Sequence, residues 1–250
     1  MSLTRDRTPS VGEVARGVHR LGSGRVNWYV LKERGAYTVV DAGLPTHYEQ
    51  LTDFLAARGA TLEDVAALVL THGHTDHVGF AERLRQERVP VYAHEGDDEL
   101  LATGGGDLPP VSLRNLYRPS VAGYLLEAVR SGGRDVPPVE QYPPVADGET
   151  LAIPGSPEVV HVPRHSPGQC ALWLRERETL LVGDSVVTWD VRTGRTGAPM
   201  LPAVLADGRQ AFESLSRFES LGPVTLLSGH GDPWRGDASE AVQLAWTAGR

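Results

Sequence analysis

Residues 70–79, "LTHGHTDHVG", place four ligand-type side chains within six consecutive positions: His72, His74, Asp76 and His77. Imidazole and carboxylate groups together are what a divalent transition metal takes as ligands in proteins. The cluster directly follows the apolar run "VAALVL", which is typical of a strand buried on both faces. The sequence therefore predicts a metal-binding loop after a buried strand, although a solvated loop could carry the same residues.

Three later stretches repeat this pattern, because each places a ligand-type residue near glycine after an apolar segment: "VPRHSPGQ", "LLVGDS" and "LLSGHGDPW". They contribute His165, Asp184 and His230. With the first cluster, they make a set of five imidazoles and two carboxylates. A catalytic zinc ion usually takes three protein ligands and a water molecule. A set of this size therefore predicts two metal ions.

The single cysteine, Cys170, excludes an internal disulfide and a cysteine-based zinc site. Any metal must then be held by histidine and carboxylate groups. We expect Cys170 and Trp189 to lie in the core. His94 and His161 fall in or beside predicted strands, outside the motifs, and we interpret them as structural residues.

Hydrophobic patterning predicts the elements that position these residues. Strands are expected at 26–32, 36–41, 65–70, 90–94, 150–153, 158–162, 170–175, 179–183 and 224–228. Helices are expected at 46–59, 77–89, 207–221 and 237–248. Two β-rich halves, each followed by helices, predict two sheets packed face to face with helices outside.

Residues 103–146 differ in composition from the rest of the chain, with Gly/Pro clusters around one helical patch, "SVAGYLLEAVRSG". We interpret this segment as an insertion or lid on a single domain that spans residues 1–250. Its apolar residues either pack under their own loop or line a substrate pocket: Leu113, Tyr117, Tyr124, Leu125 and Leu126.

The motifs HxHxDH, H-[ST]-P-G, GD and GHG, in this order over residues 41–231, resemble those of the metallo-β-lactamase superfamily. The resemblance implies an α/β fold, a four-layer αβ/βα sandwich with two face-to-face mixed sheets and helices outside. It also implies a binuclear site for two divalent ions. These are normally Zn²⁺, with iron or manganese in some members.

Carried over by position, the resemblance assigns His72, His74 and His165 to the first metal. It assigns Asp76, His77 and His230 to the second metal, with Asp184 bridging the two. A hydroxide held between the metals would be the nucleophile, and Asp76 would also act in catalysis by orienting this hydroxide or handling its proton.

Three further positions refine the resemblance. Asp41, in "VVDAG", matches an aspartate that supports the ligands from behind. Arg164 stands where the family often has glycine, which leaves substrate selectivity open. Asp184 stands where some β-lactamases of the superfamily have cysteine.

The leading functional interpretation is a metal-dependent hydrolase that cleaves an ester, thioester, lactone or related acyl bond of a small molecule, with small thioesters and lactones preferred. Alternatives are a β-lactamase, a mononuclear-iron oxidoreductase like persulfide dioxygenase, and a metal-stabilised binding protein without turnover. The dioxygenase does not use the second-metal ligands, so the presence of His77 and His230 argues against it.

The charge balance, 24 Lys and Arg against 32 Asp and Glu, gives a formal net charge of -8, and no basic run stands out. We therefore expect no nucleic-acid partner. The N-terminal residues lack the apolar core of a signal peptide, and no apolar run reaches membrane-spanning length. The expectations are a cytoplasmic protein without a membrane partner, for which a homodimer is possible, and this location also disfavours the β-lactamase interpretation.

Overall fold

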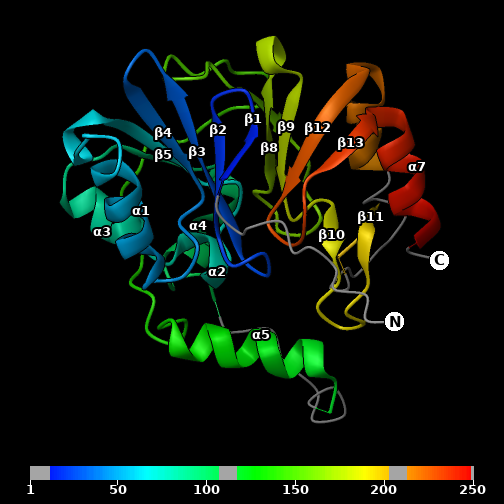
Figure 1. Cartoon of the computed structure of the whole chain (residues 1–250), viewed down its shortest axis with the longest axis horizontal. Helices are drawn as coiled ribbons and strands as arrows, with labels where there is room; N and C mark the ends of the chain where they lie inside the picture. The colour runs from blue at the N-terminus through cyan, green and yellow to red at the C-terminus, as the bar shows by residue number, and fades with distance from the viewer. Residues whose placement is uncertain (1–11, 107–116, 203–212, 249–250) are drawn as a thin grey trace.

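Two β-sheets face each other in the computed structural model, which describes residues 12–106, 117–202 and 213–248 (Figure 1). The first sheet has the order β1 (Gly12–Ala15), β2 (Val18–Gly22), β3 (Asn27–Glu33), β4 (Ala36–Val40), β5 (Val65–Val69) and β6 (Val91–Tyr92). The second has the order β13 (Trp234–Asp237), β12 (Pro223–Ser228), β9 (Thr179–Gly183), β8 (Cys170–Leu174) and β7 (Glu158–His161). A separate two-stranded sheet joins β10 (Val187–Trp189) and β11 (Thr196–Met200).

Both large sheets are mixed. Strands β1 to β4 pair antiparallel, whereas β4, β5 and β6 pair parallel. In the second sheet β9 and β12 pair parallel, and the other neighbours pair antiparallel. The carboxyl ends of the parallel strands in each sheet therefore lie together, which is where loops build sites in α/β folds.

Alternation of side chains along the strands divides the core into layers. In β3, Tyr29 and Leu31 face the second sheet and pack in one cluster with Leu172 and Leu181. Their neighbours on β3 point the other way, toward the helices that cover the first sheet. Burial on both faces explains why strands such as β8, "CALWL", are apolar at every position.

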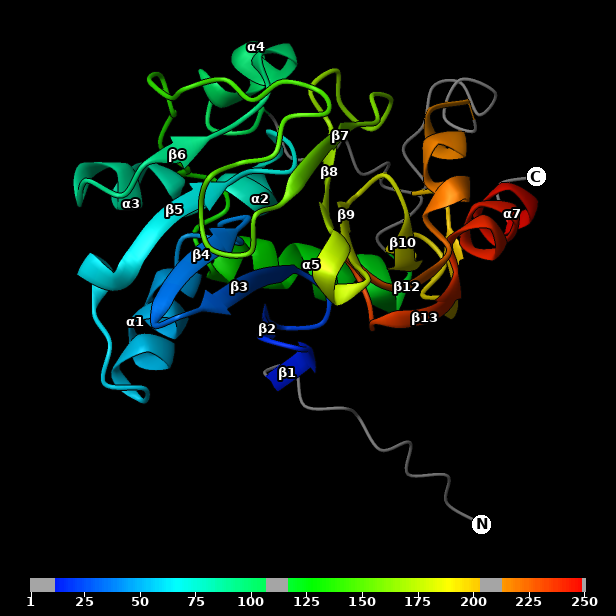
Figure 2. The same cartoon turned by 90° about the horizontal axis from the view of Figure 1, so that it is seen from above.

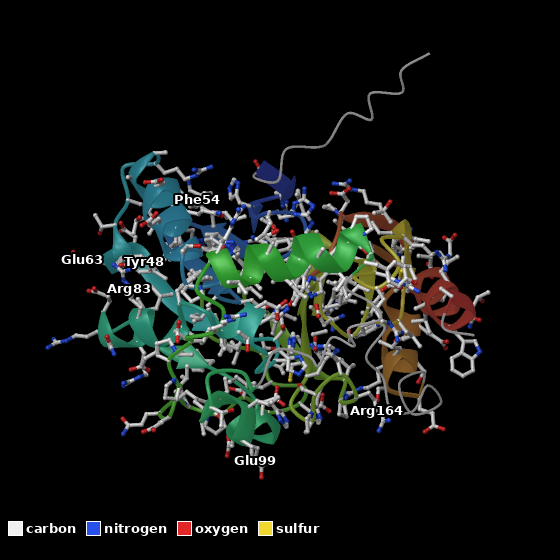
Figure 3. All side chains as sticks on the ribbon, turned by 90° about the horizontal axis from the view of Figure 1, so that it is seen from below. Tyr48, Phe54, Glu63, Arg83, Glu99 and Arg164 are labelled. Atoms are coloured by element: carbon white, nitrogen blue, oxygen red, sulfur yellow. The ribbon has the colours of Figure 1, made fainter. Side chains whose placement is uncertain are left out.

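Helices lie outside the sheets, either on their outer faces or at the end of the sandwich. They are α1 (His47–Ala56), α2 (Thr75–Val78), α3 (Ala81–Gln86), α4 (Asp98–Leu101), α5 (Pro119–Arg130) and α7 (Ala238–Ala248), with short 3₁₀ helices η1 (Leu62–Asp64), η2 (Glu95–Asp97), η4 (Arg175–Arg177) and η5 (Ser216–Leu221). Helices α1 and α3 pack on the first sheet, where the Arg83 guanidinium stacks 3.5 Å from the Tyr48 ring centroid (Figure 3). Helices α7 and η5 pack on the second sheet. The predicted four-layer sandwich is therefore confirmed (Figure 2).

Helix α5 lies apart from these layers, across the end of the sandwich near α2, and begins beside the turn that joins β10 and β11 (Figure 1). It contains most of the helical patch predicted within residues 103–146. Its inward side chains Tyr124 and Ala128 pack with Val26, Leu44 and Trp189 in a small cluster of their own. The helix predicted in the insertion is thus confirmed, whereas its role as a lid stays a prediction.

Some predicted elements differ from the structure. A strand at 150–153 is wrong: only the isolated bridge between Thr150 and Glu158 forms, because a turn at Pro154 and Gly155 reverses the chain at once. The helix predicted at 77–89 is divided into α2 and α3. At the break a side chain on Gly79 would meet the backbone oxygen of Gly43 at 2.4 Å.

The helix predicted at 207–221 falls partly on residues 203–212, outside the described residues. Residues 213–215 are helical, and the chain continues as the 3₁₀ helix η5. Strands β1, β2, β10, β11 and β13 were not predicted. Along the described residues, no helix combines the length and apolar composition required to cross a bilayer.

Replacing Leu172 in the core between the sheets with alanine should lower the free energy of unfolding by about 2–5 kcal/mol, because it leaves a cavity among fully buried neighbours. Urea unfolding of the metal-saturated protein measures this change. The control is Leu126→Ala on α5, where the side chain is 50% exposed and a change within about 0.5 kcal/mol is expected. Equal losses for the two variants would contradict the assignment of Leu172 to the core.

Candidate metal centre

Loops at one edge of the two sheets carry the predicted ligands. His72 and His74 follow β5, and α2 presents Asp76 and His77 one turn later. His165 precedes β8, while Asp184 and His230 follow the parallel strands β9 and β12. These residues lie close together because the strand ends that precede or follow them meet at the same edge of the sandwich.

The structure brings all seven predicted residues together. Three overlapping clusters have ligand atoms within 4.8 Å of one another: His72, His74 and His165; His72, His77 and Asp184; and Asp76, His77 and His230. We call the first of these sets the first trio and the last the second trio. They correspond to the two ligand sets that the motifs predict.

The carboxylate of Asp184 lies between the two trios. Its Oδ2 atom is 2.9 Å from His230 Nε2 and 3.5 Å from His165 Nε2, while its Oδ1 atom is 3.5 Å from His77 Nε2. One side chain thus approaches ligands of both trios, which is the arrangement required of a bridging group.

Unpartnered polar atoms indicate that the site fits metal ions. His72 Nε2, His77 Nε2 and Asp184 Oδ1 are buried, and within the described part of the chain they have no hydrogen-bond partner. Buried polar groups without a partner are costly and rare. Cations would satisfy all of these atoms, and imidazole and carboxylate groups are suitable donors for them.

Electrostatics divide the imidazoles into two kinds. Burial lowers the pKa of His165 to about 3 and that of His72 well below its usual value, so both rings are neutral, as metal ligands must be. Burial also opposes the charged form of His77, but the carboxylates of Asp41, Asp184 and Asp76 outweigh it and raise the pKa to about 10. The negative potential that holds a proton on His77 would equally attract a cation.

Asp41 supports the ligands from behind, as the motif match predicts. Its carboxylate accepts hydrogen bonds from the Thr71 backbone at 2.7 Å and the Thr71 hydroxyl at 2.9 Å. The same carboxylate lies 2.9 Å from His77 Nδ1. It therefore fixes the orientation of the His77 ring and leaves Nε2 facing the metal centre.

A glycine of the "SGHG" motif is required by close packing. A side chain on Gly229 would place its Cβ atom 2.2 Å from Asp184 Oδ1 and 2.4 Å from His77 Cε1. Only glycine lets this loop approach the Asp184 carboxylate and the His77 ring of the second trio at once. The sequence marks the position through the motif but does not reveal the contact.

Asp97 is a functional residue that the sequence analysis missed. Its buried carboxylate accepts hydrogen bonds of 2.7 Å from the Gly73 backbone, the Ser166 hydroxyl and the Gly168 backbone. Gly73 lies between His72 and His74, and Ser166 follows His165, so Asp97 joins the two loops that carry the first trio. In the sequence it stands beside Asp98, which is exposed, and nothing in the local pattern separates the two.

Two aromatic residues border the second trio. The Tyr124 hydroxyl donates a hydrogen bond of 2.8 Å to Asp76 Oδ2, and burial together with the Asp76 carboxylate raises the pKa of Tyr124 well above its usual value. Trp189 lies in the core, as predicted, with its ring centroid 6.2 Å from that of His230. Of the other apolar residues of the insertion, Tyr117 and Leu126 are exposed, and Leu113 lies outside the described residues.

Arg164, labelled in Figure 3, directly precedes His165 of the first trio and has a strained backbone conformation. Its φ is 144°, in the region that favours glycine, which is the residue the family often has at this position. With His165, Ser185 and Leu215, it lines a small hollow. The departure from glycine therefore imposes backbone strain directly before a predicted ligand.

The residues interpreted as structural lie outside the three clusters. The His94 and His161 rings stack with centroids 4.0 Å apart. His161 Nε2 lies 2.9 Å from the Pro167 carbonyl, and His94 Nδ1 accepts a hydrogen bond from the Gly96 backbone. Cys170 is buried, as predicted, and burial raises its pKa to about 12.

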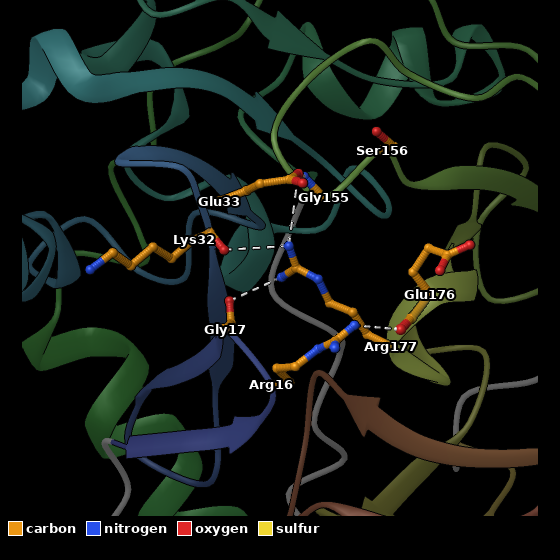
Figure 4. Close-up of a pocket in the computed structure, with 8 residues that line it drawn as sticks. All are labelled: Arg16, Gly17, Lys32, Glu33, Gly155, Ser156, Glu176 and Arg177. Atoms are coloured by element: carbon orange, nitrogen blue, oxygen red, sulfur yellow. Dashed lines mark hydrogen bonds and ion pairs between the residues drawn. The ribbon is translucent and has the colours of Figure 1, made fainter.

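A pocket of about 320 Å³ lies at the opposite end of the sheets, where β3 ends and β9 begins (Figure 4). Arg177 donates hydrogen bonds to the backbone oxygens of Gly17 and Lys32 there, and Arg16 donates to that of Glu176. These cations are engaged by the pocket wall. Because the pocket lies at the other end of the sheets and shares no residue with the three clusters, it is separate from the metal centre.

Comparison with known proteins agrees with this geometry. Residues 21–230 match the family model of the metallo-beta-lactamase superfamily. The probable metallo-hydrolase YflN of Bacillus subtilis is 30% identical over 264 aligned positions, covering 98% of this chain and 96% of the relative. Acyl-coenzyme A thioesterase MBLAC2 of Gallus gallus is 29% identical over 170 positions, covering 65% of this chain and 58% of the relative. The solved structure of TTHA1623 in a di-iron-bound form has a TM-score of 0.62 and 25% identity, covering 90% of this chain and 96% of that one.

Replacing Asp97 with asparagine should weaken binding of the metal held by the first trio by about 10- to 100-fold, because the side chain then keeps one acceptor oxygen and its amide NH2 must face a donor, either the Gly168 N–H or the Gly73 N–H and Ser166 hydroxyl. Zinc titration of the metal-free protein measures this affinity. The neighbouring substitution Asp98→Asn changes an exposed carboxylate and should leave it unchanged. Equal affinities in the Asp97 variant and the unsubstituted chain would remove Asp97 from the support of the site.

Proposed function

This chain belongs to the metallo-β-lactamase superfamily as a metallo-hydrolase, and we propose that it binds two divalent metal ions and cleaves an acyl bond of a small molecule. The first ion would be held by His72, His74 and His165. The second would be held by the second trio, with Asp184 as the bridging ligand.

The position of Asp184 is the observation that carries this proposal. Its two carboxylate oxygens lie within 3.5 Å of imidazole nitrogens from both trios. A mononuclear site needs only one trio and gives no reason for a second set of ligand-type side chains, Asp76, His77 and His230, beside the same carboxylate. The arrangement is explained most simply by two cations that share one carboxylate.

Two bound divalent ions would lower the pKa of a water molecule toward neutrality and polarise the acyl carbonyl. The chain itself contributes orientation and charge. Asp41 holds His77, and Asp76 lies with its Oδ2 atom 3.4 Å from His230 Nε2. We propose Asp76 both as a metal ligand and as the carboxylate that orients the attacking water.

We propose thioesters as the first substrate class to test, followed by lactones and simple esters. A relative is named as an acyl-coenzyme A thioesterase, and α5 places the Tyr124 ring beside the second trio, with its centroid 6.0 Å from that of His230. Zinc is the proposed native metal. Iron is the alternative that the di-iron-bound neighbour supports.

Removing metal should abolish hydrolysis, since the nucleophile and the polarised carbonyl both depend on it. Elemental analysis of the protein as purified, dialysis against a chelator, and reconstitution with zinc, manganese or iron would be followed by a panel of thioester, lactone, ester and β-lactam substrates. Two ions per chain and restored acyl hydrolysis are expected. A single iron in fully active protein, with oxygen consumption on a persulfide substrate, would overturn the proposal in favour of a dioxygenase.

Replacing Asp184 with asparagine should lower kcat by at least about tenfold, which corresponds to about 1.4 kcal/mol of activation free energy, because a neutral amide cannot balance two cations. Metal content should fall toward one ion per chain. Steady-state kinetics and elemental analysis on the same preparation test both effects. Unchanged turnover with two ions retained would exclude Asp184 from the centre.

A further inference from the structure

Helix α5 of the insertion contacts the second trio directly. Tyr124 is 6% exposed, and its hydroxyl donates a 2.8 Å hydrogen bond to Asp76 Oδ2. Its ring lies in one buried cluster with Trp189, Val26 and Leu44, so the phenol is held by packing. Figure 3, seen from below, shows α5 lying across this end of the sandwich. The hydroxyl is thus aimed at a ligand atom from outside the four layers.

The same helix reaches a second member of the trio through Arg25. Glu127, one turn after Tyr124, forms an ion pair of 3.2 Å with the Arg25 guanidinium. The backbone oxygen of Arg25 is in turn the hydrogen-bond partner of His230 Nδ1. Gly123 leaves room for this approach, since a Cβ atom there would lie 3.2 Å from Arg25 Nη2.

The first trio is supported by different residues. The Thr71 hydroxyl lies 3.1 Å from His72 Nδ1, and Asp97 joins the loops of His74 and His165. These supports come from loops of the sandwich itself. Asp41 links Thr71 to His77, so the trios share this one support, whereas the contacts of α5 reach Asp76 and His230 of the second trio.

We propose that α5 is a positioning element of the second metal site and that Tyr124 is its positioning residue. The hydroxyl fixes the carboxylate of Asp76 in the orientation that faces His77 and His230, and the Glu127–Arg25 pair holds the backbone that orients His230. This inference rests on the proposed binuclear site. It makes the insertion part of the metal centre as well as a boundary of the substrate site.

The test is Tyr124→Phe, which removes the hydroxyl and keeps the ring that packs on Trp189. Metal-free protein is titrated with zinc in competition with a chromophoric chelator, so that two affinities are obtained without any substrate. The second affinity should fall by about tenfold or more, and the first should change less than about twofold. A thermal unfolding curve of each metal-free variant checks that the fold is retained.

The chain offers a matched control in Tyr142, whose hydroxyl also donates to a carboxylate, that of Asp98, away from both trios. Tyr142→Phe should leave both zinc affinities unchanged. A second variant, Glu127→Gln, should weaken the second affinity in the same direction but less, because the Arg25 side chain is 43% exposed and its ion pair is screened by solvent.

Unchanged affinities in Tyr124→Phe would overturn the inference, because the hydroxyl would then only fill space in the core. An equal fall in both zinc affinities would also overturn it, since the substitution would then have loosened the whole site. A single zinc ion bound by the unsubstituted chain would instead overturn the proposed binuclear function, and this inference with it. The two failures are therefore distinguishable in one experiment.

Discussion

The structure depends on one constraint: a single carboxylate, that of Asp184, must approach imidazoles from loops that are far apart in the sequence. His77, His165 and His230 all lie within 3.5 Å of it. This is possible because β9 and β12 run parallel and end at the same edge as β5 of the facing sheet. The approach also requires that Gly229 carry no side chain. The close approach of these imidazoles to Asp184 thus requires both the sheet topology and a glycine in the loop.

Two further carboxylates, those of Asp41 and Asp97, hold the loops in place but belong to neither trio. Asp41 connects the loop after β4 to Thr71 and His77, and Asp97 connects the loop after β5 to the loop before β8. Each accepts several hydrogen bonds, so its burial among apolar strands is compensated. Rigid loops result, and rigid loops keep like-charged ligands close together before a cation neutralises them.

The motifs single out residues that the structure brings together, because each of them lies in a local motif after an apolar strand. The buried strands β5, β8 and β9 were likewise predictable, since their apolar runs are continuous. Residues whose role depends on distant partners were not predictable: Asp97 acts through Gly168, 71 positions away, and looks like its neighbour Asp98. The edge strand β1 was missed because its residues are only partly buried and their pattern is weak.

The insertion is connected to the second trio through the packing of α5. Its helix packs Tyr124 and Ala128 against Leu44 and Trp189, and this apolar contact brings the Tyr124 hydroxyl to Asp76. Helix α5 therefore cannot move away from the sandwich without also releasing a hydrogen bond on a second-trio residue. The first trio has no such link to the hydroxyl, since Asp97 and Thr71 support it from the sandwich. Changes in the insertion that alter substrate choice must then preserve the position of Tyr124, which restricts sequence variation to the exposed face of α5, where Leu126 and Val129 lie.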